Sequence, residues 1–425
     1  MVSFRIRAEE LDKNDPLSNY REAFYFPKTE ADQCVYFTGN SLGLQPKSVG
    51  NAINAELRDW ADYGVEGHFH AEHPWYSYHE LLMEKGAELV GAKKGEVVHM
   101  NGLTANIHFL MVSFYQPTPE KFKIICEAKA FPSDQYALES QVKFHGFDPK
   151  DAIVEVAPRP GEHTIREEDI EVAIEEHKDE LALVFWGGVN YYTGQFFDIE
   201  RITRAAHKAG VIAGFDFAHG AGNVPLDLHK WEVDFAAWCT YKYLNSGPGS
   251  VSGIYINEKH GKNKELIRFA GWWGHDKESR FKMEPGFKPV PGAEGWQLSN
   301  APVFAMAPHL ASLEMFAEVG MNKLREKSII LTGYLRELIL HVAKERGANV
   351  EIITPENPEQ RGCQLSILAH GYGKDLFNYL QKNGVFADWR EPNVIRVAPV
   401  PLYNSFMDCY HFGKLLGEAF EKLEK

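Results

Sequence analysis

The chain has 425 residues, of which 44% are hydrophobic and 24% charged, and its formal net charge is −14 at pH 7. These values are ordinary for a folded protein of two domains, or of one large domain with an appendage. The acidic charge argues against nucleic acid or an anionic membrane as a partner, since either needs a basic face. The absence of a membrane-length apolar run or a signal-peptide pattern, and five scattered cysteines without CxxC spacing, predict a reduced, cytoplasmic protein.

Apolar strands alternate with amphipathic helices through the first part of the chain. This alternation predicts the α/β class, with a mostly parallel sheet that helices cover on both faces. The expected strands are 97–100, 122–126, 153–156, 181–186, 211–217, 233–238 and 251–256, and the expected helices are 47–60, 76–90, 105–112, 135–144, 167–177 and 198–208.

The last part of the chain predicts a small α+β domain. We expect an N-terminal segment at 1–46 that packs on the small domain, a large domain at 47–310 and the small domain at 311–425. Residues 1–35 are polar and mixed, and residues 24–27 (Phe-Tyr-Phe-Pro) are expected to form a docking patch. The C-terminal elements expected are helices at 302–319, 321–346, 374–382 and from 405, and strands at 350–353, 363–369, 385–389 and 394–397.

Lys242 lies where an apolar strand runs into a loop that contains glycine, and it stands between Tyr241 and Tyr243. Apolar surroundings disfavour the charged form of an amine, and an uncharged amine is a nucleophile. A surface lysine whose stem packs on aromatic rings would have the same local sequence. A partner for Lys242 is needed to decide between these interpretations.

Asp216 is the candidate partner, since it is the acid near the end of the apolar strand 211–217. In open α/β sheets, ligands bind beyond the carboxyl ends of the strands, so Asp216 and Lys242 can face one ligand. A carboxylate for a pyridinium nitrogen and a lysine for a Schiff base are the pair that pyridoxal phosphate needs. The alternative is that Asp216 caps a helix after the strand.

A candidate phosphate site lies in the segment 97–112. A short strand meets a glycine there, and Thr104 is expected to cap the apolar helix that follows. Free N–H groups at such a helix start bind anions, which makes Gly102, Leu103 and Thr104 candidates. The alternative is an ordinary helix start, because the sequence contains no glycine-rich GxxxxGKS cradle.

Three further features have more than one interpretation. The loop 36–46, with two glycines before a proline, is either a structural turn or a loop whose backbone lines a pocket. The closely spaced His68, His70 and His73 suggest a metal site, a histidine that contacts substrate, or surface histidines. Arg396 lies among apolar residues of the last strand, so it needs either a structural salt bridge or a substrate carboxylate as its partner.

Five stretches together resemble the kynureninase family, which consists of pyridoxal-phosphate enzymes of fold type I (the aspartate aminotransferase-like superfamily). The similarity extends from about Tyr20 to near the C-terminus and is expected to be closest to eukaryotic-type members. The stretches are residues 37–46 (Phe-Thr-Gly-Asn-Ser-Leu-Gly-Leu-Gln-Pro), 127–134 (Glu-Ala-Lys-Ala-Phe-Pro-Ser-Asp), 214–219 (Gly-Phe-Asp-Phe-Ala-His), 240–245 (Thr-Tyr-Lys-Tyr-Leu-Asn) and 395–406 (Ile-Arg-Val-Ala-Pro-Val-Pro-Leu-Tyr-Asn-Ser-Phe).

For the cofactor, the resemblance implies that Lys242 binds it covalently, Asp216 pairs with the pyridine nitrogen and Phe131 stacks on the ring. The positively charged ring then acts as an electron sink. The family serine of this pocket is Gly187 here, so one side-chain contact is expected to be lost. The other expected cofactor contacts are Leu103, Thr104 and Tyr241 at the phosphate end, Asp134 and His219 beside the ring, and Trp272 and Asn300 from the second subunit of a homodimer.

For the reaction, the resemblance implies hydrolysis of the Cβ–Cγ bond of a small amino-acid substrate, kynurenine, to an anthranilate and alanine. Lys242 abstracts the α proton, Tyr241 donates a proton and Arg396 binds the substrate carboxylate. The alternatives are another fold-type-I enzyme (an aminotransferase or a desulfurase-like protein), a non-catalytic cofactor-binding module, and metal hydrolysis through the histidine cluster. The residues expected to fit 3-hydroxykynurenine, the preferred substrate, are His68, Ser299 and Asn300.

Overall fold

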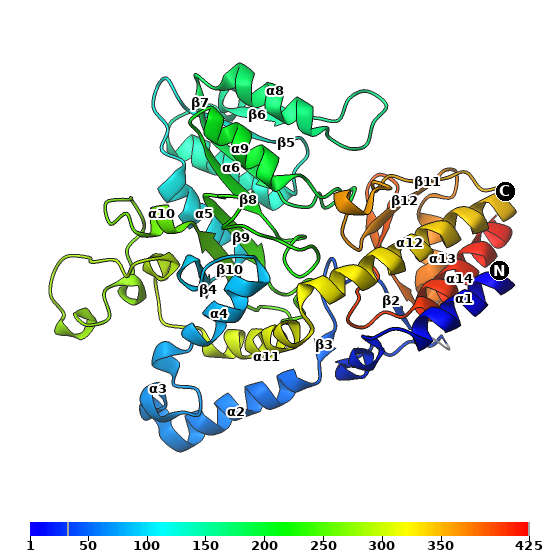
Figure 1. The fold of residues 1–425 in the computed structure, drawn as a ribbon, viewed down its shortest axis with the longest axis horizontal. Helices are drawn as coiled ribbons and strands as arrows, with labels where there is room; N and C mark the ends of the chain where they lie inside the picture. Colours follow the sequence, from blue (N-terminus) through cyan, green and yellow to red (C-terminus); the bar gives the residue numbers. More distant parts are fainter. Residues whose placement is uncertain (32–33, 424–425) are drawn as a thin grey trace.

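The computed structural model describes residues 1–31 and 34–423, and a seven-stranded sheet lies at the centre of its larger part (Figure 1). Residues 32–33 and 424–425, which belong to the expected N-terminal segment and small domain, lie outside the described residues. In spatial order the strands are β4 (Val97–Met100), β10 (Ser252–Ile256), β9 (Phe235–Cys239), β8 (Ile212–Asp216), β7 (Leu181–Gly187), β5 (Lys123–Glu127) and β6 (Ile153–Val156).

This sheet is mostly parallel, as predicted. Strands β9, β8, β7, β5 and β6 run parallel to one another, and β10 runs antiparallel to both β9 and β4. Helices cover it: α4 (Glu80–Leu89), α5 (Leu103–Phe114), α6 (Pro132–Phe144), α8 (Glu167–His177), α9 (Ile199–Lys208) and α11 (Val303–Val319), with short helices α7 (Pro149–Ala152) and α10 (Glu258–Gly261) at its margins.

Both faces of the large sheet are buried, because side chains alternate between the faces and both sets are apolar. Along β7, Val184 and Trp186 belong to one hydrophobic core, whereas Leu183 and Phe185 belong to the core on the opposite face. Full burial of each such side chain contributes about 2–3 kcal/mol. The continuous apolar run that predicted this strand therefore follows from its position in the middle of the sheet.

A second, antiparallel sheet lies in the C-terminal part, in the order β11 (Val350–Ile352), β12 (Leu365–Ala369), β15 (Val394–Val397), β14 (Asp388–Arg390). The long helix α12 (Met321–Glu345) connects the two parts, since Leu324 packs in the core of the large part and Leu335 in that of the small part. The remaining helices of the small part are α13 (Gly373–Lys382) and α14 (Phe406–Leu423).

The N-terminal residues form a helix and short strands that were not predicted from the sequence. Helix α1 (Val2–Lys13) lies beside α14, and its two buried residues, Phe4 and Ala8, belong to the hydrophobic core of the small part, where the Phe4 ring contacts Tyr334 of α12. Short strands follow: β1 (Phe24–Tyr25) pairs with β3 (Gln45–Pro46), and β2 (Val35–Tyr36) pairs with β13 (Val385–Phe386). The single strand expected at 385–389 is wrong, because its two halves, β13 and β14, bond to different sheets.

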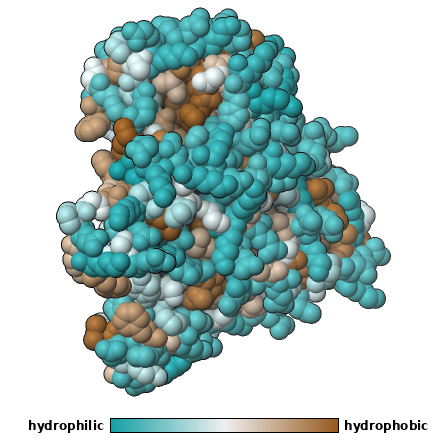
Figure 2. All heavy atoms as spheres, turned by 60° about the vertical axis from the view of Figure 1, so that its left-hand side comes forward, coloured by the Kyte–Doolittle hydropathy of each residue, from teal (hydrophilic) through white to brown (hydrophobic). Residues whose placement is uncertain are grey.

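Helix α2 (Ser48–Tyr63) forms as predicted, yet its expected apolar face is partly exposed. Val49 is buried, whereas Leu57 and Trp60 are 45% and 58% exposed. Hydrophobic residues also reach the surface at the lower end of the molecule in Figure 2, where α2 and the short helix α3 (Gly67–His70) lie. Within residues 1–31 and 34–423, no helix is long and apolar enough to cross a membrane.

Candidate active site

A cavity of about 270 Å³ lies at the carboxyl ends of β7, β8 and β9, beside the start of α5. This is the edge of the sheet where ligands of open α/β folds bind. Elements far apart in the sequence bring eight of the expected residues together in its lining: Leu103, Thr104, Phe131, Asp134, Asp216, His219, Tyr241 and Lys242.

The amine of Lys242 reaches into this cavity. Its Nζ lies 2.9 Å from Nε2 of His219 and 5.7 Å from the centre of the Phe131 ring. Burial lowers the pKa of His219 well below its ordinary value, and the charge of Lys242 lowers it further, so the imidazole is neutral and can accept a hydrogen bond from the ammonium group. Among the described residues, Nδ1 of His219 has no hydrogen-bond partner.

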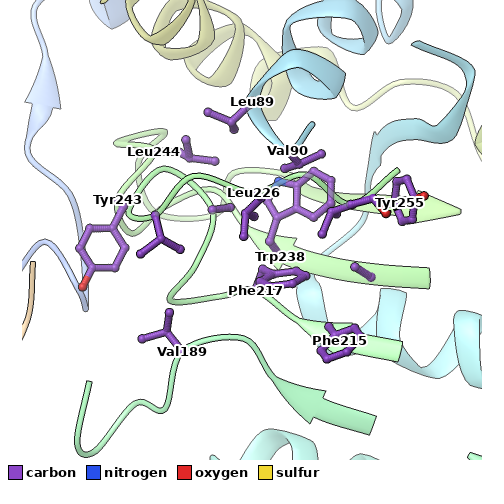
Figure 3. Close-up of a cluster of buried hydrophobic side chains, with 14 of the residues drawn as sticks. Leu89, Val90, Val189, Phe215, Phe217, Leu226, Trp238, Tyr243, Leu244 and Tyr255 are labelled. Carbon is purple, nitrogen blue, oxygen red and sulfur yellow. Dashed lines mark hydrogen bonds between the residues drawn. The ribbon is translucent and has the colours of Figure 1, made fainter. Parts of the chain in front are cut away.

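The loop that carries Lys242 is anchored on both sides. Tyr243 and Leu244 extend from it into a buried cluster with Trp238 and Leu226 (Figure 3). On the other side, the N–H of Gly43 donates to the carbonyl oxygen of Tyr241 at 2.8 Å. A Cβ atom at Gly43 would lie 2.3 Å from the carbonyl oxygen of Lys242, so this glycine permits the close approach. The backbone of the loop 36–46 thus supports the segment that carries Lys242, but no residue of this loop, which the structure describes throughout, lines the cavity, so the pocket-lining interpretation is not confirmed.

Asp216 and Asp134 form an acidic pair in the same cavity. Oδ1 of Asp216 accepts a hydrogen bond from the N–H of Ala218 at 2.6 Å, and turns follow β8. The helix-cap alternative for Asp216 is therefore wrong. Burial raises the pKa of Asp216 even though Lys242 opposes this shift. Burial also raises the pKa of Asp134 well above its ordinary value, and the Asp216 carboxylate adds to the effect, so Asp134 holds a proton that it can donate to Asp216.

The start of α5 forms the opposite wall, but Thr104 does not cap the helix. The helix begins at Leu103 with Gly102 as its N-cap, because the extended backbone ends two residues earlier than expected. The Thr104 hydroxyl instead lies 2.6 Å from the Ser133 hydroxyl, and both residues line the cavity. The free N–H groups of the first helical turn and two hydroxyl groups together suit a phosphate.

Arg396 has a protein partner beside the cavity. Its guanidinium pairs with Asp388, and its Nη1 donates to the carbonyl oxygen of Tyr191 at 2.6 Å. The hydroxyl of Ser41, from the loop 36–46, donates to the same Asp388 carboxylate at 2.5 Å. A structural salt bridge is thus present, and the binding of a substrate carboxylate by Arg396 stays a prediction.

Four expected residues lie elsewhere in the same chain. His68, Trp272, Ser299 and Asn300 are not among the described residues that line the cavity, and Trp272 is 44% exposed. His68, on α3, lies near the ring of Trp75. Ser299 and Asn300 are exposed and precede α11.

The three clustered histidines contact different partners. Nδ1 of His68 lies 2.9 Å from the Val65 carbonyl oxygen, whereas His70 and His73 approach Glu66 and Glu56, each at 3.7 Å. The described residues that could share a metal ion are instead His79, Glu80 and Glu294, and the Lys277 ammonium group already bonds to both carboxylates.

The residues present fit pyridoxal phosphate. An amine, a carboxylate for the ring nitrogen, an aromatic face and an anion site surround one cavity, and Asp134 Oδ1 has no hydrogen-bond partner within the described chain. Several lining residues had no predicted role, among them Ser133, Tyr191 and the acid Glu127. Glu127, at the end of β5, is buried, and burial raises its pKa to about 7. An acid that ends an apolar strand is the same signal that identified Asp216.

The fold and the site define a pyridoxal-phosphate enzyme of fold type I. The fold is shared with a cysteine desulfurase from Thermococcus onnurineus NA1 (TM-score 0.74, 17% identity, 98% of each chain covered) and with a C-DES variant that has glycine linked to its PLP cofactor (TM-score 0.77, 16% identity, 91% of this chain and 97% of that chain covered). The chain is 59% identical to a kynureninase from Flavobacterium psychrophilum over 409 residues, 96% of each protein. It belongs to the kynureninase family.

Further comparisons agree with this assignment. Residues 324–416 match the family model for the kynureninase C-terminal domain, and a kynureninase from Nematostella vectensis is 48% identical over 436 residues, 98% of this chain and 94% of that protein. The predicted family, fold type, cofactor and kynurenine-cleaving hydrolase activity are confirmed. The expected closeness to eukaryotic-type members stays a prediction; the bacterial relatives compared reach 59% identity and the Nematostella protein 48%.

Proposed function

We propose that this member of the kynureninase family prefers 3-hydroxykynurenine to kynurenine and acts as a cytoplasmic homodimer. Within each chain, we propose domain boundaries after residues 46 and 310. The observation that carries the catalytic proposal is that the Lys242 amine and the Asp216 carboxylate line one cavity beside the anion-binding start of α5. The two separate sheets and hydrophobic cores support the division into a large and a small domain.

Bound pyridoxal phosphate supplies an electron sink for the bonds that break at the substrate α carbon. Lys242, positioned by neutral His219, takes the α proton of the substrate. Arg396 binds the carboxylate of the substrate and so orients it. Burial raises the pKa of Tyr241, so its hydroxyl stays protonated at neutral pH and can give a proton to Cβ. The oxygen of water is added to the γ-carbonyl carbon, which becomes the carboxylate carbon of the anthranilate, and the protonated Cβ becomes the methyl group of alanine.

The exposed aromatic residues support the homodimer. Trp60 and Phe304 lie at the surface with ring centres 6.0 Å apart, and Trp272 and Phe281 form a second exposed pair at 5.5 Å. Such aromatic clusters are typical of subunit interfaces. A partner subunit that covers them would also bring Asn300 near a cavity that it does not line in its own chain. Sedimentation equilibrium tests this proposal, and a monomer at micromolar concentration would contradict it.

The Lys242→Ala variant tests the catalytic proposal most directly. We expect the turnover of 3-hydroxykynurenine to fall by at least about a thousandfold, because the group that binds the cofactor and moves the α proton is lost. Borohydride should no longer attach the cofactor to the protein, as followed by absorbance and mass spectrometry. Lys264→Ala, which changes an exposed lysine, is the control. Turnover of the Lys242 variant at the parent rate would disprove the proposal.

The Asn300→Leu variant tests the substrate preference. A site that hydrogen-bonds a substrate hydroxyl group loses discrimination when that partner is removed, so we expect the ratio of kcat/KM values for 3-hydroxykynurenine and kynurenine to fall about tenfold. The kcat/KM for kynurenine itself should change little. An unchanged ratio would remove Asn300 from the account of specificity.

A further inference from the structure

Glu127 is a buried carboxyl group in the cavity wall for which the proposed reaction has no role. It is 4% exposed, and its Oε2 accepts a hydrogen bond from Nδ2 of Asn190 at 2.8 Å. A Cβ atom at Gly187 would lie 2.5 Å from Oε1 of Glu127. The absence of a side chain at Gly187 therefore leaves room for this carboxyl group.

Asn190 begins a turn at residues 190–193, which we name the latch turn. Oδ1 of Asn190 accepts hydrogen bonds from the N–H groups of Tyr192 and Thr193, at 3.0 and 2.8 Å. The two ends of one amide group thus connect Glu127 to the backbone of the turn. The position of the latch turn consequently depends on the carboxyl group at the end of β5.

The latch turn faces the small sheet with three consecutive carbonyl groups. The carbonyl oxygen of Tyr191 accepts from Arg396 at 2.6 Å, that of Tyr192 from the Ser366 hydroxyl at 2.6 Å, and that of Thr193 from the Thr354 hydroxyl at 2.5 Å. The ring of Tyr191 also lines the cavity. One short turn therefore connects the cavity wall to the strand that carries Arg396.

We propose that Glu127 is a positioning residue which, through Asn190 and the latch turn, holds Arg396 where it binds the substrate carboxylate. This inference rests on the proposed function, since it takes the role of Arg396 from there. The space at Gly187 is what allows Glu127 to reach Asn190.

The charge of Glu127 changes near neutral pH. Burial is the main cause that raises its pKa to about 7; Asn190 opposes the shift and the Asp216 carboxylate increases it. The other titratable groups that interact with it are Asp134, Tyr191 and the thiol of the adjacent Cys126. Because an ionised carboxylate is a stronger acceptor than a neutral carboxyl group, the contact with Asn190 should tighten as the pH rises through 7. The KM for substrate should therefore fall over this interval.

The variants Glu127→Ala and Glu127→Gln test the proposal in the holoenzyme between pH 6 and 8.5. We expect Glu127→Ala to raise the KM for 3-hydroxykynurenine about tenfold or more, with kcat within about threefold of the parent, because substrate binding and not chemistry loses a support. The amide oxygen of Glu127→Gln still accepts from Asn190, so its KM should stay within about threefold of the parent but lose the dependence on pH. Pyridoxal-phosphate affinity, from absorbance titration, should change less than about threefold in both variants.

A second readout needs no activity. Because the pKa of Glu127 is raised in the folded protein, the cofactor-free parent should lose stability relative to Glu127→Gln as the pH rises from about 4 to about 7. Thermal unfolding at pH 5 and pH 8 measures this difference. Glu155→Gln, at an exposed glutamate on the neighbouring strand β6, is the matched control and should change neither readout.

The outcomes separate this proposal from the proposed function. If Arg396→Leu raises KM but Glu127→Ala does not, the positioning role of Glu127 is wrong and the role of Arg396 stands. If neither variant raises KM, the role of Arg396 is itself wrong. A loss of cofactor affinity or kcat that matches the change in KM would also overturn the proposal, because Glu127 would then serve the cofactor. If Glu127→Ala does not fold, Glu127→Gln decides: a KM that depends on pH as it does in the parent would overturn the proposal.

Discussion

Two buried aspartates at opposite ends of the same pair of strands have pKa values that are shifted in opposite directions. Asp216 is the last residue of β8, at the edge that holds the cavity, and Asp234 directly precedes β9, at the other edge. They are 7% and 1% exposed, so burial alone would raise the pKa of both. The pKa is nevertheless raised for Asp216 and lowered for Asp234.

The difference lies in their partners. The two oxygens of Asp234 receive hydrogen bonds or ion pairs from His207 at 2.8 Å, His260 at 2.7 Å, Lys259 at 2.6 Å and the N–H of Ala213 at 2.8 Å. These partners stabilise the charged form more than burial disfavours it, so Asp234 helps to hold β8 and β9 together.

Fewer groups of the chain stabilise the ionised carboxylate of Asp216. It accepts one backbone N–H, and Asp134, a second acid, lies beside it. A ligand with a protonated ring nitrogen would supply the missing positive partner. The acid at the carboxyl ends of the strands, beside the cavity, therefore lacks a partner that a ligand can supply. The acid at the amino ends has its partners within the chain and stabilises the fold.

The largest expected effect that tests this comparison is on activity. Asp216→Asn should lower kcat/KM by about a hundredfold to a thousandfold, because an amide does not stabilise the charged pyridine nitrogen. The unfolding free energy of the cofactor-free variant should be unchanged or higher by about 1 kcal/mol, since a poorly compensated buried charge is removed. Steady-state kinetics and urea unfolding measure the two effects. A large loss of stability would show that Asp216 is structural, like Asp234.

Asp234→Asn should have the reverse profile. We expect it to lower the free energy of unfolding by about 3 kcal/mol, because the hydrogen-bond donors and the lysine around Asp234 lose their carboxylate partner. The kcat of the protein that remains folded at 25 °C should stay near that of the parent. Urea unfolding provides the measurement, with Asp62→Asn, at an exposed aspartate, as the control expected within about 0.5 kcal/mol. A kcat that falls as far as in Asp216→Asn would end the distinction between the two edges.

The smallest expected effect is on pH dependence in the cofactor-free protein. The pKa of Asp234 is lowered on folding, so the advantage of the parent over Asp234→Asn should shrink as the pH falls through about 4. The pKa of Asp216 is raised on folding, so the parent should lose stability relative to Asp216→Asn as the pH rises above about 4. We expect each difference to change by about 1 kcal/mol in urea unfolding. Differences that do not change with pH would contradict both signs.

Several features of the fold and the site could not be predicted from local patterns. Helix α1 has two buried residues among polar ones, so its amphipathic signal is weak and its helical state depends on packing against α14. The segment 385–389 reads as one strand, yet the chain changes from one sheet to another within it. Thr104 was expected to be the N-cap of α5, but the N-cap is Gly102, two residues earlier; helix ends are where sequence patterns are least accurate.

By itself, the sequence determined the parallel sheet, the strand-end positions of Lys242 and Asp216 and the family motifs. These follow from hydrophobic periodicity and from residues close in the chain, which act before any long-range contact forms. Tertiary structure alone decided that Arg396 pairs with Asp388, that Gly187 makes room for Glu127, and that Asn300 lies outside the cavity of its own chain. Each of these depends on side chains from distant elements that meet when the two parts pack together, and no local pattern encodes such a meeting.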